Sequence, residues 1–209
     1  MYKFRKTTIQ SFKSELEIQN NLDFLARLYL PLIEKYENES NTEYKNHIKL
    51  MLSQSIKYTD NISNLKASKA ARELSKKILE KELSVANLSE EEKDWILTNY
   101  DISKISVNGQ TVPAINGGLG DAKRQSKEKH FHWEHATPNS QIVSKLLNLN
   151  ICSLNSDLEK VNKVIEVLRL HQIIWITKEE DDKLTRAGFR DKNRPVWQDA
   201  YKSCGIIVE

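Results

Sequence analysis

Apolar residues recur at helical spacing through the first half of the chain. Between residues 8 and 38, leucines and isoleucines cluster at positions three or four apart, the period that places them on one face of an α-helix. Pro31 falls inside this stretch and predicts a kink or a break. Two further helices are predicted on the same grounds over about 44–58 and 61–83. The second of these has a face rich in Lys and Glu, which is typical of exposure to solvent.

Short local signals predict where later helices begin and end. Three pairs have the spacing of a capping box, namely Ser89 with Glu92, Ser156 with Glu159, and Thr177 with Glu180. In such a box the hydroxyl and the carboxylate bind backbone N–H groups that the first turn leaves free. Gly188 predicts the end of the last of these helices, because glycine readily adopts the left-handed conformation that closes many helices.

The pattern changes near residue 103. Asn108-Gly109 lies between β-prone residues and predicts a hairpin over 105–113. Residues 116–120 form a glycine-rich segment without the Gly-Lys-Ser/Thr ending of a phosphate-binding loop, so we expect a flexible connection. Residues 173–176, Ile-Ile-Trp-Ile, predict a strand. The expected fold is mainly α with a small β component (α+β): a helical region over 1–100 and a mixed α/β region over 101–209, as separate units or as one continuous domain.

Composition excludes few classes of protein. The chain has 32 Lys and Arg against 29 Asp and Glu, a net charge of +3 that by itself does not imply nucleic-acid binding. No apolar run approaches the ~20 residues that span a bilayer, and residues 1–6 lead into a polar helix rather than into the apolar core of a signal peptide. Cys152 and Cys204 lack the paired spacing of a zinc knuckle. We therefore expect a soluble cytoplasmic protein with reduced thiols and no membrane partner.

The candidate chemistry is concentrated in residues 129–138, Lys-His-Phe-His-Trp-Glu-His-Ala-Thr-Pro, which hold three of the chain's five histidines. Imidazole and carboxylate groups bind divalent metals and move protons near neutral pH. If residues 129–135 form a strand, alternation places His130, His132 and Glu134 on one face and Phe131, Trp133 and His135 on the other. The first face has the composition of a metal site, and the second resembles a core face with one ionisable group at its end.

Glu134-His135-x-x-Pro138 resembles the first strand of HNH-type nucleases, also called ββα-metal or His-Me finger nucleases. In that family the acidic residue helps to hold one divalent metal and the histidine activates water. The resemblance implies Glu134 as a metal ligand and His135 as the general base. The composition of its strand face makes His132 a second candidate ligand. The resemblance also implies a later asparagine, for which Asn162 is the first candidate and Asn155 the second. Residues 138–150 are predicted to be helical, where the family has a second strand.

Four cations lie just before the histidines: Lys123, Arg124, Lys127 and Lys129. They form either a solvated loop or a set of contacts to a phosphate backbone. The leading hypothesis is a metal-dependent nuclease of restriction, homing or phage-defence type. It would use Mg²⁺ or Mn²⁺ and act on DNA, with RNA as the other candidate substrate. The oligomeric state stays open between a monomer and a homodimer.

Two alternatives stay open beside the nuclease. One is a non-enzymatic interaction protein in which the helical half is the binding module and the histidines form a hydrogen-bonded surface or a subunit contact. The other is a ribonuclease toxin that uses His130, His132 and His135 without metal. Chelation of divalent metal distinguishes the last hypothesis from the nuclease. For His47, His171 and the two cysteines we expect structural roles.

Overall fold

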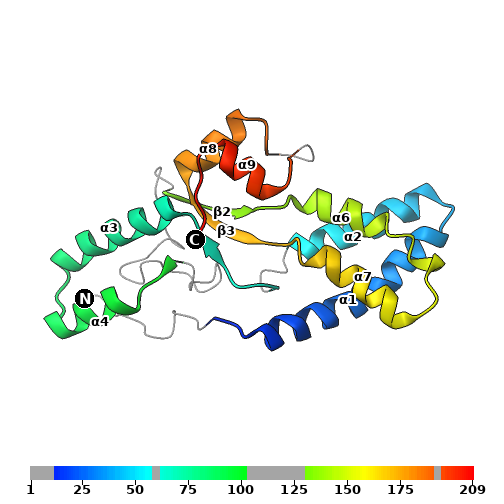
Figure 1. Ribbon diagram of the computed structural model, residues 1–209, viewed down its shortest axis with the longest axis horizontal. Helices are drawn as coiled ribbons and strands as arrows, with labels where there is room; N and C mark the ends of the chain where they lie inside the picture. The colour runs from blue at the N-terminus through cyan, green and yellow to red at the C-terminus, as the bar shows by residue number, and fades with distance from the viewer. Residues whose placement is uncertain (1–11, 58–61, 103–129, 191–193) are drawn as a thin grey trace.

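The computed structural model describes residues 12–57, 62–102, 130–190 and 194–209 (Figure 1). In these residues the helices are α1 (Glu15–Asn38), α2 (Thr42–Lys57), α3 (Lys69–Val85), α4 (Glu90–Asn99), α6 (Asn139–Leu147), the short 3-10 helix η3 (Ile151–Ser153), α7 (Asp157–Leu168), α8 (Lys178–Arg186) and α9 (Trp197–Ser203). The strands are β1 (Lys66–Ala67), β2 (Phe131–His135) and β3 (Ile173–Thr177). The fold is mainly α with a small β component, as the sequence predicts. Within the described part of the chain, no helix has the length and apolarity that crossing a bilayer requires.

The three strands form one mixed sheet in the order β1-β3-β2. β1 runs parallel to β3, and β2 runs antiparallel to it, with Trp133 opposite Trp175. Every residue of β3 is buried, because helices cover both faces of this central strand. Trp175 packs with residues of α3 on one face, and Ile174 and Ile176 pack with residues of α8 and α9 on the other. The side chains of β2 therefore alternate between the side of the sheet covered by α3 and the side covered by α8.

Helices α1, α2, α6 and α7 pack into a helical cluster on the side of the sheet away from α3 and α4 (Figure 1). Leu22 and Ile33 of α1, Leu52 of α2 and Leu146 of α6 are at most 1% exposed. Two of these helices precede residue 100 and two follow it. This hydrophobic core therefore contains helices from both sides of residue 100.

α1 continues through Pro31, so the break that this proline suggests is absent. Pro31 is exposed to solvent, whereas Tyr29 and Ile33 on either side of it are buried in the helical cluster. Burial on both sides holds the two parts of the helix against the same core, which outweighs the hydrogen bond that proline cannot donate.

The helix expected over 61–83 begins later than its pattern indicates. Ser68 is the N-cap of α3 and accepts a hydrogen bond from the Ala71 N–H. Lys66 and Ala67, just before it, pair with β3 instead of forming helix. The sequence pattern missed β1 because two residues are too few to show alternation. The hairpin and the glycine-rich segment expected over 105–120 lie outside the described residues.

α8 is fixed at both ends by the local signals that its sequence contains. Thr177 accepts a hydrogen bond from the Glu180 N–H, and the Glu180 carboxylate accepts one from the Thr177 N–H, which completes the capping box. Gly188 has a φ of +77°. The N–H groups of Gly188 and Phe189 donate hydrogen bonds to carbonyls of the last turn of α8, which is the Schellman motif. The box at Ser89 is also complete, and at Ser156 the hydroxyl accepts from the N–H of Glu159.

Candidate metal centre

His132, Glu134 and Asp181 converge where β2 meets α8. Alternation along β2 places His132 and Glu134 on the same face of the strand, and Asp181 comes from the first turn of α8. The distance from His132 Nε2 to Glu134 Oε2 is 3.1 Å, and from His132 Nδ1 to Asp181 Oδ2 it is 3.8 Å. One potential ligand atom from each residue lies within 4.8 Å of the other two. We call these three residues the metal cluster.

The metal cluster combines buried carboxylates with an imidazole that reaches solvent. Glu134 and Asp181 are 7% and 5% exposed, whereas the His132 side chain is 39% exposed. A third carboxylate, that of Glu180, is also buried, and it accepts hydrogen bonds from the Ser68 hydroxyl at 2.6 Å and from the backbone of Thr177. An ion arriving from solvent would therefore meet His132 first and the carboxylates beneath it.

The charges around the metal cluster do not balance. In the part of the chain that the structure describes, Arg194 is the single buried cation, and its Nη2 lies 2.5 Å from Glu134 Oε1. Lys178 approaches Asp181 at 3.6 Å, but its side chain is half exposed. The region thus contains three buried carboxylates and one buried guanidinium, which pairs with Glu134. Uncompensated charge in a poorly solvated site is costly, so this arrangement favours the binding of a metal cation.

Arg194 holds Glu134 in place from below. Its Nη1 donates to the carbonyls of His135 and Ala136 at 3.0 Å each, and its Nε donates to the carbonyl of Phe189. Burial acts to raise the pKa of Glu134, but the hydrogen bond from His132 and the charge of Arg194 outweigh it and bring the pKa below its usual value. Glu134 is therefore a carboxylate at neutral pH, the form that a metal ligand needs.

Tyr201 of α9 adds an unpartnered polar group to this region. Its side chain is 1% exposed, and among the described residues its hydroxyl finds no hydrogen-bond partner. Burial raises the pKa of Tyr201, and the negative charge of Glu134 raises it further. The phenol is therefore neutral, and its proton remains available to donate to an acceptor that enters the site.

The structure brings together two of the residues that the sequence singles out and adds a third. His132 and Glu134 lie side by side, as their alternation predicts. Sequence reasoning missed Asp181, because an acidic residue in a first helical turn is favoured by the helix dipole wherever a helix begins. It also missed Arg194, which lies 60 residues after Glu134 and has no motif around it.

His135 and the asparagine candidates lie elsewhere. The His135 ring packs against His171, with ring centroids 5.4 Å apart, on the face of β2 opposite the metal cluster. Asn162 and Asn155 are exposed, and α7, which carries Asn162, packs against α1 and α6. The structure therefore does not bring His135 or Asn162 to the carboxylate of Glu134. Lys123, Arg124, Lys127 and Lys129 lie outside the described residues.

Burial of His171 is expected to make the stability of the protein depend on pH, whether or not a metal is bound. His171 is 2% exposed, and burial, helped by the charge of His135, lowers its pKa to about 4. The unfolded chain binds a proton below about pH 6.5 while the buried ring stays neutral, so the contribution present above that pH is lost between pH 6.5 and 4. The free energy of unfolding should fall by roughly 3 kcal/mol across this window.

Urea denaturation at several pH values measures this effect. The variant His171→Leu should lose most of the slope between pH 6.5 and 4, because the group that titrates is gone. His47→Leu is the matched control, since His47 is exposed on α2 and should leave the slope unchanged. An identical slope in wild type and His171→Leu would contradict the assignment.

Comparison of the chain with protein-family models, with curated proteins and with solved structures found no match.

Proposed function

We propose that this protein is a metal-dependent nuclease whose divalent ion is held by His132, Glu134 and Asp181. The observation that carries the proposal is the charge imbalance of the site: three buried carboxylates, one buried guanidinium and an imidazole at the solvent side. A divalent ion is the partner that such a site best accommodates. The proposed substrate is the phosphodiester backbone of DNA, with RNA as the alternative, and the proposed setting is a cytoplasmic restriction, homing or phage-defence system.

The donor set favours Mn²⁺ over Mg²⁺. Mg²⁺ is bound almost entirely through oxygen, whereas Mn²⁺ accepts an imidazole nitrogen beside carboxylates and binds more tightly to mixed sites. Binding would replace the direct contact between His132 Nε2 and Glu134 Oε2, which lie 3.1 Å apart. When bound, the ion would lower the pKa of a coordinated water and offset the charge that develops on phosphate oxygens. Arg194 would keep Glu134 oriented towards the ion.

The arrangement of elements also supports the proposal. β2 and β3 are antiparallel, and α8 follows β3 directly and contacts both strands. The proposed ligands come from β2 and α8. This β2-β3-α8 arrangement is similar to the ββα unit of HNH-type nucleases, although α6 and α7 lie between β2 and β3 in the sequence (Figure 1). His135 departs from that family, because its side chain lies on the other face of β2. The proposal therefore gives the ligand role to Glu134 and places His135 outside the metal site.

The test combines calorimetry with a cleavage assay. Mn²⁺ should bind with one site per chain, and cleavage of supercoiled plasmid or of RNA should require Mn²⁺ or Mg²⁺ and stop in EDTA. His135→Ala should bind Mn²⁺ as tightly as wild type. Its cleavage rate tests the role that the resemblance implies, because loss of a general base at His135 would lower turnover by about 10²–10⁴-fold.

Each outcome distinguishes a hypothesis. Cleavage that persists in EDTA would replace the proposal by the metal-independent ribonuclease. Mn²⁺ binding without cleavage of DNA or RNA would remove the nuclease activity and leave a metal-binding interaction protein. Failure to bind Mn²⁺ would show that His132, Glu134 and Asp181 do not form a metal site.

A further inference from the structure

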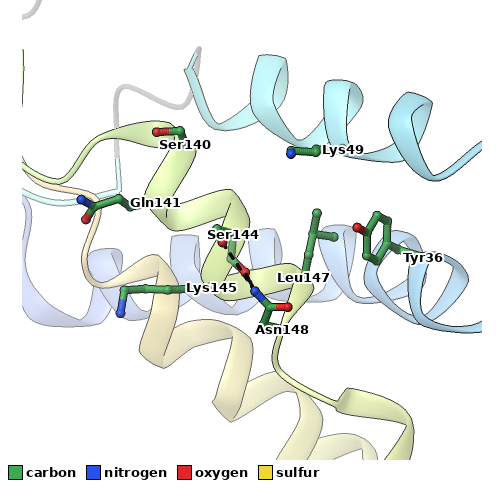
Figure 2. Close-up of a pocket in the computed structure, with 8 residues that line it drawn as sticks. All are labelled: Tyr36, Lys49, Ser140, Gln141, Ser144, Lys145, Leu147 and Asn148. Carbon is green, nitrogen blue, oxygen red and sulfur yellow. Dashed lines mark hydrogen bonds between the residues drawn. The ribbon is translucent and has the colours of Figure 1, made fainter. Parts of the chain in front are cut away.

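A groove between α2 and α6 lies apart from the metal cluster and has its own chemical character. It has a volume of about 610 Å³, and the residues that matter for its chemistry are Lys49, Ser140, Gln141, Ser144, Lys145 and Asn148. Figure 2 shows Lys49 on α2 and Lys145 on α6, with Ser144 between them in this view. A second hollow of about 590 Å³ shares Tyr36 and Leu147 with the groove and adds both Lys45 and Glu37.

The groove is positively charged. Its lining contains two lysines and no acidic residue, and residues 136–156 contain Lys145 but no Asp or Glu. Within the described residues neither Lys49 nor Lys145 forms an ion pair, unlike Lys160 and Lys163 on nearby α7. Both ammonium groups are therefore free to bind an anion from solution.

Neutral hydrogen-bond donors line the same surface. The hydroxyls of Ser140 and Ser144 lie along α6 between its first turn and its middle. Hydroxyl and amide donors beside cations are the groups that proteins use to contact phosphate and sugar oxygens of nucleic acids. From Ser140 to Asn148 the helix rises by about 12 Å, which is longer than a single phosphate group. A polymer backbone fits this length better than a single phosphate does.

The groove is connected to the metal cluster through α6. This helix begins at Asn139, four positions after β2 ends at His135. Gln141 Nε2 donates to the backbone carbonyl of Arg194 at 2.8 Å, and Arg194 in turn pairs with Glu134. The first turn of the groove wall is thereby anchored to the residue that positions a metal ligand.

We infer that the groove between α2 and α6 binds the phosphodiester backbone of the nucleic-acid substrate. The inference rests on the proposed function, because it names the surface that would hold that substrate. Lys49 and Lys145 supply the charge, and the hydroxyls of Ser140 and Ser144 on α6 fix the position of the backbone.

The experiment measures binding of a labelled 20-base-pair DNA duplex, and of single-stranded RNA of the same length, by fluorescence anisotropy. EDTA is present to prevent cleavage, and the salt concentration is varied from 50 to 200 mM. The double variant Lys49→Gln/Lys145→Gln should bind at least 10-fold more weakly at the lowest salt. Its slope of log affinity against log salt should be smaller by about two units for duplex DNA, since each phosphate contact contributes roughly 0.9. The matched control is Lys76→Gln/Lys77→Gln, which changes two exposed lysines of α3 and should leave the slope unchanged.

The outcomes separate this inference from the proposed function. Unchanged binding by Lys49→Gln/Lys145→Gln, or equal losses in both double variants, would overturn the role of the groove. Competition by inorganic phosphate at low millimolar concentration would also overturn it, in favour of a site for small anions. Mn²⁺ affinity should be the same in wild type and in both double variants, because none of these lysines touches the metal cluster. If the wild-type protein neither binds Mn²⁺ nor cleaves nucleic acid, the result would instead count against the proposed function.

Discussion

Replacing Arg194 by alanine is expected to lower the free energy of unfolding by about 3–5 kcal/mol. Arg194 is 6% exposed and makes its bonds in four directions, to the Glu134 carboxylate and to the carbonyls of His135, Ala136 and Phe189. Alanine would leave Glu134 as a buried carboxylate close to Asp181 and without its main counter-charge. Urea denaturation at pH 7 in EDTA measures the loss without interference from metal.

Two variants show whether the loss comes from Arg194 in particular. Arg190→Ala removes an exposed arginine from the same segment and should change stability by no more than about 0.5 kcal/mol. Arg194→Lys retains the charge but loses the planar fork that reaches several carbonyls at once, so it should recover only part of the loss. If Arg194→Ala lowers the free energy of unfolding by less than about 1 kcal/mol, solvent and not Arg194 compensates the charge of Glu134.

Replacing Asp181 by asparagine is expected to weaken Mn²⁺ binding by at least about 100-fold. Changes to groups that only support a metal ligand already reduce affinity by 10–100-fold, and Asp181→Asn removes the charge of a ligand with little change in shape. Cleavage should fall in parallel and recover in part at higher Mn²⁺ concentration. In EDTA the variant should be as stable as wild type or more stable, because it relieves repulsion among three buried carboxylates.

Asp182→Asn is the matched control for this change, since Asp182 is the next residue of α8 and its side chain is 54% exposed. Its Mn²⁺ affinity should equal that of wild type. The same affinity in Asp181→Asn would exclude Asp181 from the ligands. Asp181 gives a cleaner test than Glu134, because neutralising Glu134 would also leave the buried Arg194 without its partner.

The sequence determined the features of this protein that depend on neighbours along the chain. Alternation with a period of two placed His132 and Glu134 on one face of β2 and Trp133 on the other, which the structure confirms. Capping at Thr177 and the positive φ of Gly188 fixed the bounds of α8. These features follow from sequence because hydrogen bonds within one turn and steric limits at one residue do not depend on the rest of the fold. The role of the cations from Lys123 to Lys129 stays a prediction.

Only the tertiary structure decided which of these elements meet. Asp181 belongs to the metal cluster because β3 pairs with β2 and α8 packs back on both strands, and many other acids of the chain occupy equally favourable helical positions. Arg194 reaches Glu134, and Lys49 comes to lie across a groove from Lys145, through packing between segments distant in sequence. Such contacts depend on the relative placement of whole elements, to which a local pattern of hydrophobic and polar residues contributes only the face that each element buries. The ligand set and the basic groove therefore arise from packing, whereas the strand and the helix that carry them can be read from the chain.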